Sequence, residues 1–382
     1  MEAFSTFTPE HDAFRARVRA FAQAELRPHS RRWDEAGTVP RDAIRAMGAA
    51  GILGVIAPKD LGGEARDFVS LGIAIEEIAA ADLSCALIAW QQATFTRFFP
   101  GWGDETVRAA LKGEICLALA TSEEDAGSDV SAMSTTARPE GGEYVVNGTK
   151  IHVSQVPGAA FLAVSAWVGE AAAKRPMVLL RVPVDAPGVT CEPMEQMGVR
   201  AHQLGIVRLR DVRVPRSALL GGESEGKALM YARYNVSRCM SPLAALGAAR
   251  AAVDQTMEFA RTKVVFGRPI AANQSISFAL VEHHTRIEAA RYLVYRALAM
   301  NDAGQNAQRE AAMGKWFGIT TGVQAIQDCL QLLGANGYLK DHGMEQRLRD
   351  VNALYFTGGT IQVMKLLLVR DLLGAQFAGL RA

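Results

Sequence analysis

The chain has 382 residues, which suggests two or three structural units rather than one core. Hydrophobic residues make up 49% of it and charged residues 21%, the balance of a soluble globular enzyme. Its 41 Lys and Arg residues against 40 Asp and Glu residues exclude a strong positive field that would hold DNA or RNA nonspecifically.

The sequence carries no targeting or membrane signal. The first residues contain acids and lack a basic-then-apolar pattern, and the apolar runs are far shorter than the ~18–20 residues of a membrane span. The cysteines are scattered and show no C-x-x-C spacing. We therefore expect a reduced cytoplasmic protein without a metal site and without a membrane or nucleic-acid partner.

Residues 1–113 have the pattern of a helical domain. Phe14, Val18 and Phe21 follow one another at helical spacing and predict an amphipathic helix. The segment APKDLGG at 57–63 is rich in turn residues and predicts a connection between helices.

The pattern changes at about residue 114. Short apolar, β-branched segments alternate with turns and predict a β domain over 114–225, folded as a small barrel or sandwich. Within one of these segments, Asn147–Gly148 is a turn signal. From 226 to 382 the helical spacing returns and predicts a C-terminal bundle with one long helix, two more at 275–300 and 309–334, and a last one at 360–372.

Five motifs carry polar or glycine residues at the ends of predicted elements. Each is ambiguous alone, because a polar turn or a capped helix start has the same composition. They are TSEEDAGSDV (121–130), NGTKIHVS (147–154), RTKVVFGRPIAANQ (261–274), QLLGANGY (331–338) and FTGGTIQVMK (356–365). No nucleophile elbow, P-loop or G-x-G-x-x-G follows a predicted strand, so a hydrolase, a kinase and a Rossmann oxidoreductase find no support.

In this order and spacing the motifs resemble the acyl-CoA dehydrogenase family over nearly the whole chain. The resemblance implies a mainly α fold with a central β domain: an N-terminal helical domain, a β domain and a C-terminal four-helix bundle. It also implies non-covalent FAD, an acyl thioester substrate, and a homotetramer in which a neighbouring subunit covers the adenosine half of the cofactor.

The resemblance assigns cofactor-binding roles residue by residue. Positions matched to the flavin ring or its edge are Thr121, Ser122, Ser128, His152 and Ser154. Positions matched to the pyrophosphate and adenosine are Lys263, Phe266, Gln274, Gln331, Ala335, Thr360 and Gln362. Arg238 matches the arginine that lines the thioester site, and Ser128 is a second substrate-binding candidate.

The catalytic base of the family has no counterpart at its two usual positions. One is Gly358 and the other is Ser237, and neither side chain is a competent base near neutral pH. The backbone N–H of Gly358 is present whatever the side chain. It remains a candidate to polarise the thioester carbonyl as an oxyanion-hole donor.

Three functions remain open at this point. The first is an FAD-dependent oxidoreductase that acts on an unusual acyl thioester, on CoA or a carrier protein, without the usual Glu. The second is a flavin-dependent oxygenase or oxidase on the same fold that uses O₂. The third is a non-catalytic flavin-binding protein. The electron acceptor is accordingly an electron-transfer flavoprotein or O₂.

Overall fold

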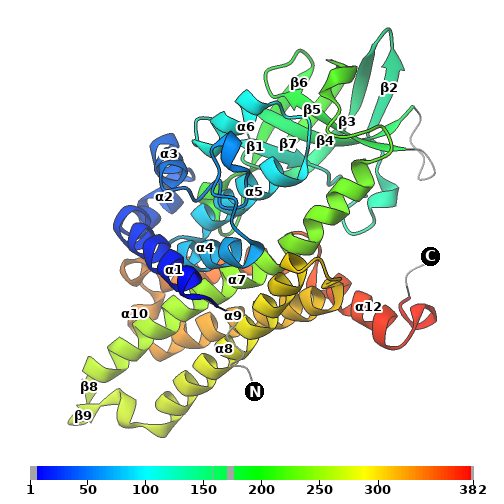
Figure 1. Cartoon of the computed structure of the whole chain (residues 1–382). Helices are drawn as coiled ribbons and strands as arrows, with labels where there is room; N and C mark the ends of the chain where they lie inside the picture. The colour runs from blue at the N-terminus through cyan, green and yellow to red at the C-terminus, as the bar shows by residue number, and fades with distance from the viewer. Residues whose placement is uncertain (1–6, 157, 170–175, 380–382) are drawn as a thin grey trace.

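A computed structural model describes residues 7–156, 158–169 and 176–379. Helices form both ends of the chain, and the strands of the central sheet, within residues 117–215, lie between them in sequence and at one end of the molecule in space (Figure 1). The predicted architecture, mainly α with a central β domain, is confirmed.

The N-terminal helices pack around two that are almost wholly buried, α4 and α5. Thr8 caps α1 with a reciprocal capping box, and Asp82 caps α5 through the N–H of Cys85. The helices are α1 (Pro9–Phe21), α2 (Ser30–Ala36), α3 (Arg41–Ala49), α4 (Phe68–Ala81), α5 (Leu83–Phe98) and α6 (Asp104–Leu111).

The central strands form one seven-stranded sheet, with the order β1-β4-β2-β3-β7-β6 and with β5 paired to β4. Alternate residues of β3, β4 and β7 fill a core separate from that of the helices. The strands are β1 (Leu117–Ala120), β2 (Thr136–Glu140), β3 (Glu143–Ser154), β4 (Phe161–Val168), β5 (Met177–Pro183), β6 (Val189–Met194) and β7 (Leu204–Pro215).

The turn predicted at Asn147–Gly148 is wrong. Strand β3 continues through both residues, and only its register against β7 shifts there. The Asn147 amide exchanges hydrogen bonds with Asp211 of β7, and a Cβ at Gly148 would lie 2.2 Å from Oγ1 of Thr135. Glycine is therefore needed for a close approach inside a bulged strand, not for a chain reversal.

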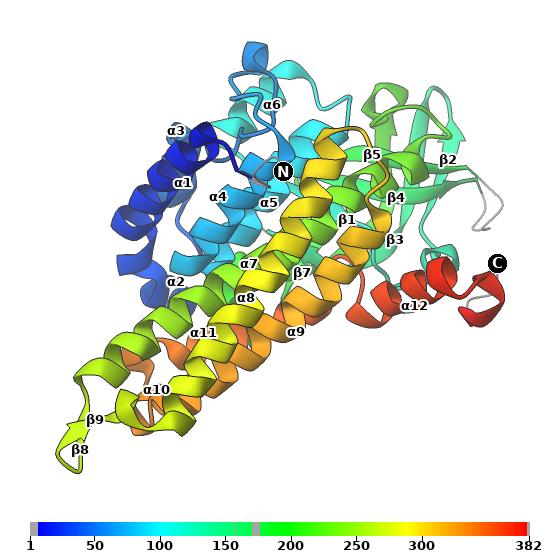
Figure 2. The ribbon, with the colours of Figure 1, turned by 60° about the horizontal axis from the view of Figure 1, so that its bottom comes forward.

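Three long helices, α7 (Gly226–Thr262), α8 (Gln274–Asp302) and α9 (Gln308–Leu332), lie side by side and form most of the C-terminal bundle (Figure 2). A short hairpin, β8 (Val264–Val265) and β9 (Arg268–Pro269), joins α7 to α8 at the far tip of the molecule. The last helices are α10 (Ala335–Tyr338), α11 (Met344–Asn352) and α12 (Ile361–Leu372).

A buried charge cluster holds α4 against the bundle. The carboxylate of Glu76 is wholly buried and accepts hydrogen bonds from Arg15, Arg291 and the hydroxyl of Tyr295. Burial raises the pKa of Glu76, but Arg291, Arg15 and Arg250 outweigh burial and bring that pKa down to about 2. The ionised carboxylate therefore links α1 and α4 to α8.

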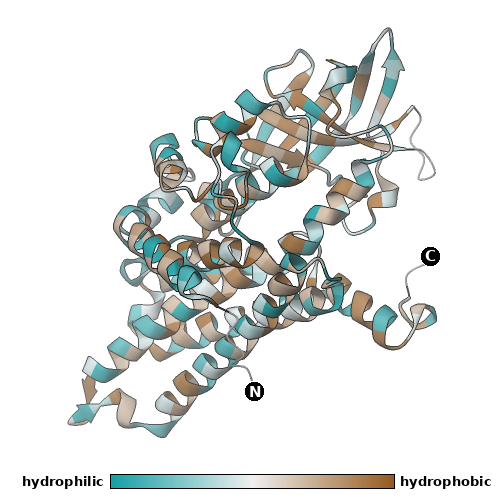
Figure 3. Cartoon of the chain, in the orientation of Figure 1, coloured by the Kyte–Doolittle hydropathy of each residue, from teal (hydrophilic) through white to brown (hydrophobic). Residues whose placement is uncertain are grey.

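Apolar residues of the strands and of the long helices form buried clusters, and apolar and polar residues alternate along the ribbons of these elements (Figure 3). Within the described ranges, no helix combines the length and the hydropathy that crossing a bilayer requires.

Candidate active site

Thr121 and Ser122 follow directly after β1, at the edge of the sheet that faces α7. The N–H of Ile151 in β3 donates to the carbonyl of Ser122 at 2.9 Å, which ties these residues to the NGTKIHVS strand. Beneath them, the buried ammonium of Lys150 donates to Glu123 at 2.8 Å and to the carbonyl of Thr121 at 3.3 Å. These hydrogen bonds fix the backbone at the end of β1, which carries the hydroxyl groups of Thr121 and Ser122.

His152 lies in an irregular part of β3. Its φ is +55°, in the left-handed region, and the register against β7 shifts between Lys150 and Val153. The imidazole is exposed, while the following Ser154 is half-buried and pairs with Leu204. A bulge next to a strand end turns a side chain out of the regular alternation, which is common beside functional sites.

Arg238 lies in the first half of α7, and its side chain is buried near Lys315 of α9. Tyr234 stands one helical turn before Arg238, and burial raises the pKa of its hydroxyl. Arg238 is 8% exposed, its Nε has no hydrogen-bond partner in the described residues, and burial lowers its pKa. A buried guanidinium that keeps a free donor is suited to a ligand that accepts hydrogen bonds.

Pro242 stands inside α7, four residues after Arg238. Because proline has no N–H, it cannot complete the helical bond to the carbonyl of Arg238. The helix ladder is therefore interrupted at the turn that carries Ser237 and Arg238.

Ser237 is buried and already engaged. Its hydroxyl accepts a hydrogen bond of 3.2 Å from the indole Nε1 of Trp90 in α5. The neighbouring Arg233 also reaches α5, where its Nε donates to Oγ1 of Thr94 at 3.1 Å. These contacts make this face of α7 a packing surface against α5.

The loop before α12 completes the site and is held by a residue of α9, Lys315, that was not predicted from the sequence. Gly358 and Gly359 both have a positive φ, +65° and +91°, and Thr360 caps α12 by accepting from the N–H of Val363. The ammonium of Lys315 in α9 donates to three successive carbonyls, those of Thr357 at 2.7 Å, Gly358 at 2.9 Å and Gly359 at 2.6 Å.

Lys315 is completely buried and forms no ion pair among the described residues. Burial and the nearby Arg238 lower the pKa of Lys315 to about 7, while three carbonyl acceptors favour its ammonium form. The only sequence signal was a lone lysine in an otherwise uncharged stretch of α9, GKWFGITTG, which is also compatible with an exposed position.

The other predicted cofactor residues lie elsewhere. Gln362 is exposed on α12, and Ser128 is exposed in the loop after β1. A further group lies toward the opposite end of the bundle, near the β8–β9 hairpin (Figures 1 and 2), and its members are exposed: Lys263, Phe266, Gln274, Gln331 and Ala335. A single chain therefore brings the end of β1, with Thr121 and Ser122, beside the end of β3, with His152 and Ser154, and separates both from most of the residues assigned to adenosine.

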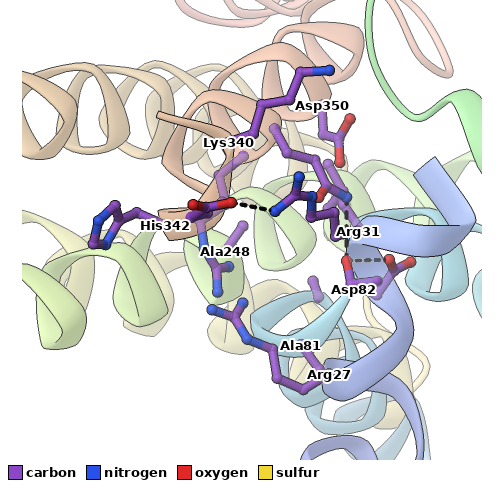
Figure 4. Close-up of a pocket in the computed structure, with 15 residues that line it drawn as sticks. Arg27, Arg31, Ala81, Asp82, Ala248, Lys340, His342 and Asp350 are labelled. Atoms are coloured by element: carbon purple, nitrogen blue, oxygen red, sulfur yellow. Dashed lines mark hydrogen bonds and ion pairs between the residues drawn. The ribbon is translucent and has the colours of Figure 1, made fainter. Parts of the chain in front are cut away.

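A separate cavity of about 160 Å³ lies between the N-terminal helices, α7 and α11. Figure 4 shows Arg27, Arg31 and Asp82 directed toward it. Some of its polar groups bond to one another, since Ser30 donates to Asp82 at 2.6 Å and Arg31 to Asp341 at 2.5 Å. None of the predicted site residues lines this cavity, so it is a polar cavity between helices that is separate from the candidate site.

The polar groups at the end of β1, at Arg238 of α7 and at the start of α12 fit a flavin cofactor. The strand-end hydroxyls, the unpaired Nε of Arg238 and the capped start of α12 all offer donors to a group rich in acceptors. No cluster of three potential metal ligands occurs in the part of the chain that the structure describes.

Comparisons with known proteins agree along the entire chain. Profiles of the acyl-CoA dehydrogenase N-terminal, middle and C-terminal domains match residues 8–116, 118–212 and 224–373. An acyl-CoA dehydrogenase of Bacillus subtilis and a 3-(aryl)acrylate reductase of Clostridium sporogenes are each 32% identical to this chain, over 96% of it and 99% of the relative.

Solved structures agree as well. A glutaryl-coenzyme A dehydrogenase in complex with glutaryl-CoA superimposes with a TM-score of 0.93 at 26% identity, covering 98% of both chains. A prolyl acyl carrier protein oxidase, AnaB, superimposes with a TM-score of 0.88 at 25% identity, covering 98% of this chain and all of the other. This chain therefore belongs to the acyl-CoA dehydrogenase family of FAD-binding oxidoreductases.

Proposed function

We propose that this protein oxidises an acyl thioester whose α-proton is already acidic, and that no side-chain carboxylate at position 358 or 237 removes that proton. The observation that carries the proposal is the loop before α12, where glycine replaces a carboxylate but the backbone donors remain. None of the hydrogen bonds of the described residues uses the N–H of Gly358, Gly359 or Thr360. Such donors stabilise negative charge on a carbonyl oxygen.

The cofactor would be held by residues from three elements. Thr121, Ser122, Ser128, His152 and Ser154 would face the flavin ring, and Thr360 and Gln362 would bind further along the cofactor. FAD, when bound, supplies the acceptor for the hydride that leaves the β-carbon. The protein itself binds and orients the thioester through Arg238 and the N–H of Gly358.

The substrate follows from the missing base. An unactivated α-C–H is a very weak acid, and its removal needs a positioned base. A thioester with an electron-withdrawing or conjugating substituent loses this proton to water or to its own basic group. Two similar proteins are named for acyl groups with polar substituents, a benzylmalonyl-CoA dehydrogenase and the prolyl acyl carrier protein oxidase AnaB. We extend that class to this chain, on CoA or on a carrier protein.

The assembly would be a homotetramer in the cytoplasm. Phe266 is fully exposed at the tip of the β8–β9 hairpin, and Gln331 and Ala335 are exposed toward the same end of the bundle. A partner subunit would cover these residues, and Lys263, Phe266 and Gln274 of this chain would then reach the cofactor that the partner binds. The acceptor would be an electron-transfer flavoprotein, the kind of protein to which one similar structure relates, of Acidaminococcus fermentans.

The test is an anaerobic titration of the purified FAD-loaded protein with acyl thioesters, followed by flavin absorbance. The panel pairs butyryl- and octanoyl-CoA with thioesters of acidified α-carbons, such as benzylmalonyl-CoA and a prolyl carrier protein. We expect bleaching by members of the second group only. Bleaching by butyryl-CoA at a comparable rate would contradict the missing base, and no bleaching by any thioester would support a non-catalytic flavoprotein.

Two further measurements sharpen this result. Oxygen consumption that matches thioester consumption and places oxygen in the product would identify the oxygenase instead. Arg238→Met keeps an unbranched side chain in the buried position but removes the unpaired donor. We expect this variant to keep FAD and to bind thioesters at least about tenfold more weakly, as loss of a charged hydrogen bond typically costs.

A further inference from the structure

Lys315 is a fully buried cation without an ion pair among the described residues. The other fully buried lysine, Lys150, is paired with the carboxylate of Glu123. Lys315 instead has three uncharged acceptors and lies close enough to Arg238 for repulsion between the two cations. Burial of a charge without a counter-ion is costly, and it persists only where the geometry compensates.

The compensation comes from an exact match of donors and acceptors. An ammonium has three N–H donors, and the carbonyls of Thr357, Gly358 and Gly359 accept all three within 2.6–2.9 Å. Three successive carbonyls converge on one point only because the chain turns through positive φ at Gly358 and Gly359. In this ammonium form all three donors are used and Nζ carries no lone pair, so Lys315 acts here as a hydrogen-bond donor and not as a base.

The same geometry directs the N–H groups of the loop. In a trans peptide the N–H points opposite to the carbonyl of the same unit. The three peptide units that Lys315 binds carry the N–H groups of Gly358, Gly359 and Thr360, so these point away from the lysine. They are also the N–H groups that donate no hydrogen bond in the described part of the chain.

A positive charge beside the carbonyl oxygen of a peptide unit makes the N–H of that unit a stronger hydrogen-bond donor. An ammonium bound to a carbonyl oxygen draws electron density through the peptide unit and makes its N–H a better donor, and hydrogen bonds in series reinforce one another in a buried site. We propose that Lys315 is a positioning residue that orients and polarises the N–H groups of residues 358–360 to hold negative charge on the thioester oxygen. This role rests on the proposed function.

A purely structural alternative is that Lys315 only stabilises the segment that follows α11, because cations stabilise the unpaired carbonyls beyond the C-terminal end of a helix. Under that alternative Lys315 contributes to stability and has no effect on the acidity of a bound thioester. The two roles are therefore separated by a measurement of acidity and not by a measurement of stability.

The experiment uses acetoacetyl-CoA as a probe, because its α-proton ionises in an accessible pH range and its enolate has its own ultraviolet absorption. The pH at which half of the bound probe is ionised is measured on the FAD-loaded wild type and on Lys315→Met. We expect the midpoint pH on the wild type to be lower than that of the free probe. On Lys315→Met the midpoint should rise again, with an ionisation constant of the bound probe at least about tenfold smaller than on the wild type, the order expected for weakened oxyanion donors.

Matched variants complete the design. Lys365→Met makes the same change at an exposed lysine of α12 that contacts Trp316 rather than the loop, and it should ionise the probe as the wild type does. Lys315→Gln keeps two donors without the charge and should give an intermediate midpoint, which also provides the test if Lys315→Met does not fold. A wild-type midpoint in a folded Lys315→Met or Lys315→Gln protein would overturn the role of Lys315. A wild type that leaves the probe's ionisation unchanged would overturn the proposed function itself.

Discussion

The indole Nε1 of Trp90 donates a 3.2 Å hydrogen bond to the hydroxyl of Ser237, and both side chains are buried. This contact joins α5 to the turn of α7 that carries Arg238. Ser237 therefore has a structural hydrogen-bond partner, and its hydroxyl oxygen is not free to accept a proton from a substrate. With glycine at position 358, neither of the two expected base positions offers a group that is free to act.

Replacing Ser237 by alanine tests this structural role. Ser237→Ala leaves the buried N–H of Trp90 without an acceptor, which typically costs about 1–3 kcal/mol of unfolding free energy. We expect this loss in urea denaturation, with FAD binding and turnover nearly unchanged. Ser241→Ala, one turn along α7, is the control, because the buried hydroxyl of Ser241 has no partner in the described residues and its removal should be neutral or stabilising. Loss of turnover in Ser237→Ala would make Ser237 catalytic.

Introducing a carboxylate at position 358 tests the missing base. Gly358→Glu should increase turnover of butyryl-CoA by up to about 100-fold, since a positioned general base contributes about 10²–10⁴. A Cβ at this position would lie 3.7 Å from Nζ of Lys315, so the ammonium would keep the new carboxyl ionised. The φ of +65° costs any side chain about 1–2 kcal/mol. Gly358→Ala carries the same strain without the base and should show no gain.

The exposed hairpin tip predicts an assembly. Phe266 is fully exposed and has a φ of +51°, a conformation that is costly for an aromatic residue. We expect Phe266→Ser to weaken both oligomerisation and FAD retention, measured by light scattering and by the ratio of flavin to protein absorbance. Met197→Ser changes an exposed apolar residue of the β domain, outside the bundle, and should alter neither. A wild-type monomer with full FAD content would contradict this prediction.

Acid should destabilise the protein through Glu76. The folded-state pKa of Glu76 is about 2, below its usual value of 4.5, so its ionised form stabilises the fold at all pH values above about 4.5. This contribution is lost as the pH falls from about 4.5 to 2. The unfolding midpoint in urea should therefore drop between pH 5 and pH 3.

The matched variant for this measurement is Glu76→Gln, which removes the titrating group. We expect it to be less stable at pH 7, by the roughly 3–5 kcal/mol typical of a broken buried ion pair, and to lose less stability than the wild type on acidification. Glu258→Gln alters an exposed carboxylate 3.9 Å from Arg261 and should retain the wild-type pH dependence. Equal acid sensitivity of Glu76→Gln and the wild type would assign the effect to other carboxylates.

The sequence by itself determined the architecture and the family. Hydrophobic spacing predicted the long helices α7, α8 and α9, because each buries one or more continuous apolar faces whose period is a property of the local chain. The motif series identified the FAD-binding family. The resemblance also assigned Arg238 to the thioester site; the structure shows that its side chain is buried, and its role there stays a prediction.

Contacts between distant segments were decided only by the tertiary structure. Asn147–Gly148 has the composition of a turn, yet pairing with β7 on one side and the closeness of Thr135 on the other make it a bulge. In the sequence Lys315 resembles any other helical lysine, but α9 places it beneath the loop before α12, where three carbonyls accept hydrogen bonds from its ammonium group. Local patterns record which face of an element is apolar. They do not record which charged group another element places beside it, because that depends on how the whole chain packs.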